Sequence, residues 1–189
     1  AEYRDLFITA EDAMIEADQN TLLVVVDVNR PQYVESEPLL ESVSKIALID
    51  HHRRCAEFIQ NATFTFHEPY ASSTCELVTE LMQYLLESAD ILPCESEALL
   101  AGIVLDTKNF TMKTGVRTFE AAAYLRSRGA STVDCKKLFS NDMDIFRARN
   151  AIIDNAETYS DCAISIVQEK LDNIRLVTSQ AADEMLKLG

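Results

Sequence analysis

The chain has 189 residues, of which 48% are hydrophobic, and a formal net charge of −14 at neutral pH. This length and apolar content can bury the core of one domain with a remnant of a second, and no apolar run approaches the ~20 residues of a membrane span. The net negative charge excludes the broad basic surface of a protein that binds duplex nucleic acid.

The first half of the chain predicts alternating strands and helices. Residues 22–27 are a short apolar run typical of a buried strand, and residues 35–44 predict a helix with Pro38 in its first turn, where proline is tolerated. Residues 45–50 predict a second strand, which a helical crossover makes parallel to the first. The alternating, β-rich residues 62–66 predict an edge strand.

The second half is predicted to be mostly helical. Ser73 and Glu76 have the spacing of a capping box that begins a helix running to about Ser88. Further helices are expected over residues 95–108, 117–128, 132–139 and 143–158. A strand over residues 163–167 and a helix over residues 179–187 follow. Because one strand and one helix cannot bury a core alone, they predict the start of a second domain.

Acids and imidazoles follow three apolar segments. Asp27 ends the first strand, Asp50-His51-His52 ends the second, and Asp106 ends a later apolar run. Because parallel strands bring their carboxyl ends to one edge of a sheet, we expect Asp27 to meet the Asp50–His52 group. Carboxylates with imidazoles suit a hard divalent cation, Mn²⁺ before Zn²⁺, and predict a metal-assisted hydrolase. Taken singly, an aspartate after a strand is more often a helix cap or turn residue than a metal ligand.

Four stretches, residues 24–31, 49–54, 71–80 and 102–110, resemble successive motifs of the DHH phosphodiesterase superfamily. Within it the chain is most similar to the GdpP type, bacterial phosphodiesterases that hydrolyse cyclic di-AMP, and residues 113–122 favour this subgroup over RecJ-like exonucleases. The resemblance implies that the intact enzyme hydrolyses cyclic di-AMP to linear pApA with two Mn²⁺ ions. A short-oligonucleotide exonuclease, a manganese pyrophosphatase and a non-catalytic nucleotide-binding module remain as alternatives.

The resemblance also implies a fold class and a domain organisation. Residues 1–158 are expected to form a parallel-sheet α/β DHH domain with a helical second half, and residues 159–189 to begin an α/β DHH-associated domain that binds substrate. The family's first motif, His-x-x-x-Asp-x-Asp, has no counterpart between Ala1 and Asn20, and the second domain's Gly-Gly-His motif is absent. We therefore expect a partial catalytic fragment with at most a partial metal site.

The cellular setting follows from the same resemblance. It implies the cytoplasmic domain of a membrane-anchored bacterial protein, and it leaves a homodimer open. Five cysteines without a Cys-x-x-Cys pair agree, because they favour free thiols in a reducing compartment.

The resemblance assigns a role to each residue of the expected centre. Asp27 matches the carboxylate that bridges both metals, and His51 and Asp106 match ligands of the second metal. Asp50 is expected to orient an imidazole as a hydrogen-bond acceptor. His52 is expected to face the scissile phosphate, as donor to a non-bridging oxygen or as general acid to the leaving 3′ oxygen.

Substrate contacts are expected from five further side chains. Ser72, Ser73 and Thr74 lie at a predicted helix N-terminus, where free backbone N–H groups attract anions, although Ser73 alone would equally serve as a helix cap. Arg117 lies near a helix start, where a cation opposes the helix dipole, so a phosphate contact is favoured. Arg53 follows the two histidines, where a phosphate contact and a surface ion pair are equally expected.

Overall fold

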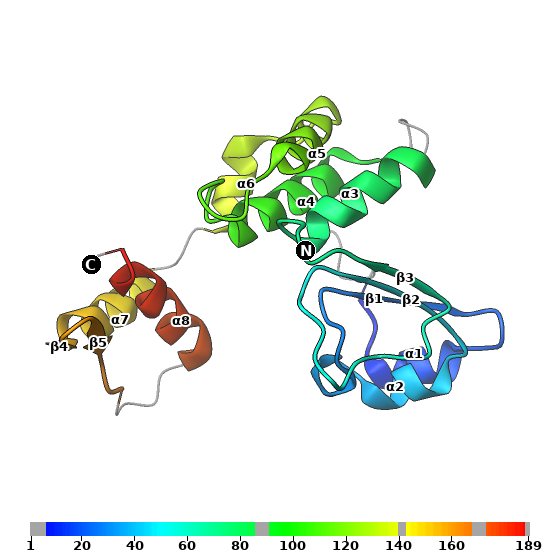
Figure 1. Ribbon diagram of the computed structural model, residues 1–189, viewed down its shortest axis with the longest axis horizontal. Coiled ribbons are helices and arrows are strands. Elements are labelled where there is room, and N and C mark those ends of the chain that lie inside the picture. Colours follow the sequence, from blue (N-terminus) through cyan, green and yellow to red (C-terminus); the bar gives the residue numbers. More distant parts are fainter. Residues whose placement is uncertain (1–6, 86–90, 140–142, 168–172, 188–189) are drawn as a thin grey trace. The chain divides into compact units, whose positions relative to one another are not determined.

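Parallel strands and short helices alternate at the start of the computed structural model, which describes residues 7–85, 91–139, 143–167 and 173–187 (Figure 1). The chain divides into two compact units, residues 1–138 and residues 139–189. The first unit contains α1 (Ala10–Glu16), β1 (Leu22–Val26), the 3₁₀ turn η2 (Pro31–Tyr33), α2 (Glu37–Ser42), β2 (Lys45–Asp50), β3 (Phe64–His67), α3 (Thr74–Leu85), α4 (Pro93–Asp106), α5 (Val116–Ser127) and α6 (Thr132–Leu138). The second contains α7 (Met143–Asp154), β4 (Glu157–Tyr159), β5 (Cys162–Ile164) and α8 (Ile174–Met185).

The sheet of the first unit has the order β1-β2-β3, and both pairings are parallel. Val26 pairs with Ile49 and Asp50 pairs with His67, so all three strands end at the same edge. The predicted α/β fold, its parallel sheet and its helical second half are confirmed. The consequence for function is that the residues following β1 and β2 meet at one place.

Burial on both faces fixes β2 in the middle of this sheet. Ile46 and Leu48 belong to a buried cluster with Leu40 of α2, while Ile49 packs on the other side against Leu77 of α3. Figure 1 shows α1 and α2 together on one side of the strands. A continuous apolar run is what a strand covered on both faces requires.

Helices α3 to α6 bury a separate core beside the sheet. Its buried members are Leu100, Ala101, Ile103, Ala121, Ala122, Leu125, Ala130 and Cys135. Gly102 lets α4 approach α3 closely, because a Cβ atom there would collide with the sulfur of Cys75. This packing fixes the last turn of α4, which ends at Asp106.

The second unit differs from its predicted elements in three ways. The helix expected over residues 143–158 ends at Asp154, because residues 157–159 instead pair as β4 with β5 in an antiparallel hairpin. The strand expected over residues 163–167 is β5, displaced toward the N-terminus. Helix α8 begins at Ile174 rather than residue 179, since its buried Val177 packs in one cluster with α7.

The division between the two units falls after Leu138, because α7 packs against α8. The domain boundary expected at residue 159 stays a prediction. Ser88, the residue at which the helix beginning near Ser73 is expected to end, lies outside the described residues. Within the described part of the chain, no helix combines the length and apolar character needed to cross a membrane.

Candidate metal and catalytic site

Asp27 stands directly after β1 in a left-handed conformation, with φ at 65°. Aspartate tolerates this conformation better than most residues, and the backbone N–H of Asp27 still donates to the Ile49 carbonyl at 3.0 Å. The Thr74 hydroxyl, at the first residue of α3, donates to Asp27 Oδ1 at 2.8 Å. The strand end and the helix start together aim this carboxylate.

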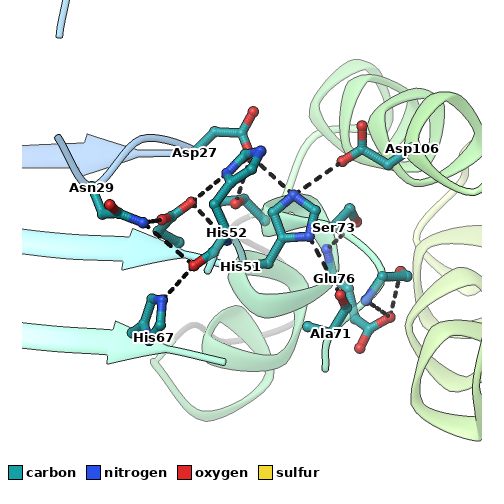
Figure 2. Close-up of polar contacts among 12 residues, drawn as sticks. Asp27, Asn29, His51, His52, His67, Ala71, Ser73, Glu76 and Asp106 are labelled. Atoms are coloured by element: carbon teal, nitrogen blue, oxygen red, sulfur yellow. Dashed lines mark hydrogen bonds and ion pairs between the residues drawn. The ribbon is translucent and has the colours of Figure 1, made fainter. Parts of the chain in front are cut away.

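The imidazole of His51 is buried between two carboxylates (Figure 2). Its Nδ1 lies 3.3 Å from the Ala71 carbonyl oxygen. A proton on Nδ1 donated to that carbonyl leaves the lone pair on Nε2, which lies 3.6 Å from Asp27 Oδ1 and 3.8 Å from Asp106 Oδ2. Three segments far apart in the sequence thus converge on one ring nitrogen.

Asp106 reaches the group from the last turn of α4. Partial burial raises the pKa of its carboxyl, and the nearby Asp27 carboxylate raises it further. His51, His52 and Lys113 act in the opposite direction and lower this pKa. Two carboxylates held beside one buried imidazole form a negative pocket that a cation would stabilise.

The donor set fits a divalent metal ion. Carboxylate oxygens with one imidazole nitrogen suit Mn²⁺ or Zn²⁺, and the Ala71 carbonyl holds His51 in the tautomer that a metal ligand needs. Within the described residues, Asp27, His51 and His52 also place ligand atoms within 4.8 Å of one another. Asp27, His51 and Asp106, the three metal ligands predicted from the sequence, are therefore brought together.

His52 lies beside His51 but is held by a different network. Its Nδ1 lies 2.8 Å from Oδ1 of the fully buried Asp50, which also accepts the His52 backbone N–H at 3.2 Å. With Nδ1 donating to Asp50, Nε2 is the ring nitrogen that can meet a ligand. The His52 ring packs edge-on to His51, with 4.5 Å between ring centroids.

Asn29 completes this network and was not singled out from the sequence. It is 3% exposed, and its side-chain N–H₂ group donates to Asp50 Oδ2 and, at 3.3 Å, to the His52 carbonyl oxygen (Figure 2). The His52 carbonyl also accepts from His67 Nε2 at 2.6 Å. Only its place in the stretch 24–31 could have drawn attention to Asn29.

Three residues just before and at the start of α3 are buried and hydrogen-bonded within the protein: Ser72, Ser73 and Thr74. Ser73 Oγ accepts from the Glu76 backbone N–H at 3.0 Å, so Ser73 caps the helix. The Glu76 carboxylate accepts from the Ser72 hydroxyl at 2.6 Å and from the Ser72 backbone, one residue earlier than a capping box requires. The predicted contacts of Ser72, Ser73 and Thr74 with substrate stay predictions.

Arg117, the second residue of α5, makes a two-pronged ion pair with Glu80 of α3. Nε to Oε1 and Nη2 to Oε2 are both 2.7 Å, and the carboxylates of Glu68 and Glu76 lie at 3.9 and 4.0 Å. The hydrogen-bonded Glu80 raises the pKa of Arg117 above its ordinary value. A phosphate contact from Arg117 stays a prediction, as does one from the exposed Arg53 in the loop after β2.

Comparison with known proteins decides the family. Residues 3–103 match the family described as "DHH family, N-terminal domain". The chain belongs to the DHH family. The superfamily resemblance predicted from the sequence motifs is confirmed.

Relatives of this DHH chain include two bacterial enzymes. It is 43% identical over 186 residues to the cyclic-di-AMP phosphodiesterase GdpP of Bacillus subtilis, covering 97% of this chain and 28% of that protein. It is 41% identical over 182 residues to the cyclic-di-AMP phosphodiesterase PdeA of Listeria monocytogenes, covering 96% and 28%. The chain therefore spans about 28% of the length of these relatives.

A solved structure shares the fold. An exopolyphosphatase-related protein from Bacteroides fragilis superposes with a TM-score of 0.68 at 23% sequence identity, over 85% of this chain and 46% of that protein. At this identity the likeness concerns the fold alone.

Proposed function

We propose that this chain is part of a metal-dependent phosphodiesterase that hydrolyses cyclic di-AMP to linear pApA. The observation that carries the proposal is the convergence of Asp27 and Asp106 on Nε2 of His51, at 3.6 and 3.8 Å. The substrate class rests on relatives more than 40% identical over nearly the whole chain, both named as cyclic-di-AMP phosphodiesterases.

The proposed metal is Mn²⁺, held by Asp27, His51 and Asp106. A divalent cation bound there would act as a Lewis acid on a phosphoryl oxygen and offset developing negative charge. Asp27 has two carboxylate oxygens, so it is the residue suited to serve two ions. We propose that the remaining ligands of a two-ion centre come from outside these 189 residues.

We propose that His52 acts on the substrate rather than on the metal, although it can also place a ligand atom within 4.8 Å of those of Asp27 and His51. Asp50 accepts from Nδ1, which fixes the plane of the ring and leaves Nε2 as the nitrogen for a substrate contact. From that position Nε2–H can donate to a non-bridging phosphate oxygen or pass its proton to the leaving 3′ oxygen. Asp50 is accordingly proposed as a positioning residue for the His52 ring.

The remaining proposals concern substrate and setting. Arg53 and Arg117 are proposed as phosphate contacts, for which Arg117 would have to exchange its Glu80 partner. Residues 159–189 are proposed to begin the DHH-associated domain, for which β5 and α8 supply an α/β pattern. The intact protein is proposed to be membrane-anchored with this part in the cytoplasm, and homodimeric.

Metal binding and hydrolysis test the proposal separately. Titration calorimetry of the chain with Mn²⁺ is expected to show weak binding of about one equivalent, because half of the proposed centre lies outside the chain. Asp106→Asn should weaken this binding, whereas Asp144→Asn, an exposed carboxylate on α7, should leave it unchanged. An absence of heat, or equal effects of the two variants, would contradict the proposed ligands.

Hydrolysis is measured as conversion of cyclic di-AMP to pApA in the presence of Mn²⁺. We expect the chain extended by its flanking segments to turn over far faster than the chain alone, because losing one of two cations removes half of the charge neutralisation. An extended form that cleaves pyrophosphate or short oligonucleotides but leaves cyclic di-AMP intact would overturn the proposed substrate.

A further inference from the structure

A groove of about 640 Å³ lies beside the candidate metal site, in the first unit. One wall is the turn before α3, with Tyr70 and Ala71, and the other is the segment that leads from α4 into α5, with Phe110, Lys113 and Phe119. Neither the proposed metal ligands nor the residues expected to contact phosphate line it.

Exposed aromatic rings give this groove its character. Tyr70 is 92% exposed and Phe119 is 56% exposed, although each ring is large and apolar. Phe119 stacks on Phe110 with 5.6 Å between centroids and 15° between ring planes. The partner ring fixes the orientation of Phe119 while more than half of its surface remains open. Rings held in this way are suited to stacking with a flat ligand.

Two residues that line the groove, one in each wall, are neighbours of the metal site. The carbonyl of Ala71, in the groove wall, accepts from the ring of His51 at 3.3 Å. Lys113, in the opposite wall, belongs to the segment that follows Asp106 at the end of α4. A ligand that reaches the proposed metal ions with a phosphate can therefore extend into the groove with whatever that phosphate carries.

Charge selects the kind of ligand. The chain carries a net charge of −14, so an anion needs a local cation, and Lys113 in the groove wall supplies one. The hydroxyls of Thr111 and Thr114 donate to backbone carbonyl oxygens of the same segment, so toward a ligand in the groove they can serve only as acceptors. Aromatic walls with a cation at one end match a nucleotide, with a planar base attached to an anionic phosphate.

We propose that this groove is a base subsite, which takes a nucleobase of the substrate on the rings of Tyr70 and Phe119, with Lys113 beside the attached phosphate. The inference rests on the proposed function and deepens it, because it names the part of the site that holds the base. Stacking accepts every base, so this subsite supplies affinity for nucleotides without selecting adenine.

Two probes with the same phosphate and sugar test the subsite. AMP and ribose 5-phosphate differ only by the base, and each is titrated into the Mn²⁺-loaded chain. Aromatic stacking predicts that AMP binds roughly five- to a hundredfold more tightly than ribose 5-phosphate. Tyr70→Ala and Phe119→Ala should each remove most of that difference while leaving the affinity for ribose 5-phosphate unchanged.

Tyr84→Ala is the matched control, because Tyr84 is 88% exposed and lies on α3 outside this groove. The proposal is overturned if AMP and ribose 5-phosphate bind equally, if AMP fails to bind at millimolar concentration, or if the control variant loses as much affinity as Tyr70→Ala. If the chain prefers AMP but the extended form leaves cyclic di-AMP intact, the base subsite stands and the proposed reaction fails. If cyclic di-AMP is cleaved but AMP has no advantage, the reverse holds.

Discussion

Removing the amide of Asn29 should destabilise the first unit by leaving a buried charge with one partner fewer. Asp50 is fully buried, and its two carboxylate oxygens divide their partners, with Oδ1 toward His52 and Oδ2 toward Asn29. In Asn29→Ala the carboxylate loses a charge-assisted hydrogen bond, and the His52 carbonyl loses a donor at 3.3 Å.

The magnitude follows from these contacts. A hydrogen bond to a buried charge contributes about 1.5–3 kcal/mol. Part of the loss is offset, because Oδ1 of Asn29 is itself buried without a hydrogen-bond partner and disappears with the side chain. We therefore expect the free energy of unfolding to fall by about 2 kcal/mol.

Urea unfolding followed by circular dichroism measures this change, with the slope of the transition checked for constancy. Asn20→Ala, an exposed amide in the turn before β1, is the control and should lie within about 0.5 kcal/mol of the original protein. A loss below about 0.5 kcal/mol for Asn29→Ala would show that Asp50 does not depend on this amide. Asn29→Asp should be worse at neutral pH, because it places a second carboxylate against Asp50.

Three further predictions concern the site and the packing beneath it. In a catalytically active extended form, His52→Ala should lower kcat with little change in metal content, whereas His51→Ala should lose metal and activity together. Metal analysis and steady-state rates measure the two effects. The opposite pattern would mean that the roles of the two histidines are exchanged. Burial raises the pKa of the Cys75 thiol from 9.0 to about 11, so as the pH rises the unfolded chain loses this proton before the folded chain does. The free energy of unfolding should therefore fall by roughly 2 kcal/mol between pH 9 and 11. Urea unfolding at both pH values measures this fall, and Cys75→Ala should remove the part that is due to the thiol. Gly102→Ala should lower the urea midpoint of unfolding although alanine favours a helix, because the added methyl group meets the sulfur of Cys75. Cys75→Ala in the same chain should restore the midpoint. An unchanged midpoint in the single variant would show that α3 and α4 can move apart without cost.

An element of the fold can be predicted from the sequence where one local pattern determines its structure. The run from Lys45 to Asp50 is apolar and β-rich, and the observed β2 has those bounds because both faces of the strand are covered. The meeting of Asp27 with His51 followed from parallel strands sharing one edge. The place of Asp106 at the end of α4 could be predicted as well, because it is the first polar residue after an apolar run.

Contacts between distant residues could not be predicted in this way. Asn29 resembles a turn residue in sequence, and only the folded chain brings its amide to Asp50. Arg117 was correctly placed at a helix start, yet its partner Glu80 is on another helix and carries no local signal. The β4–β5 hairpin was missed because three-residue strands are too short to show a period, and residues 157–158 were absorbed into the preceding helix.

Helix α3 carries members of two separate polar networks. Its first residue, Thr74, donates to the Asp27 oxygen that faces His51, and six residues further along Glu80 pairs with the guanidinium of Arg117. One helix therefore supplies both the hydroxyl that orients Asp27 and the carboxylate that holds Arg117, so the packing of this helix matters to both networks.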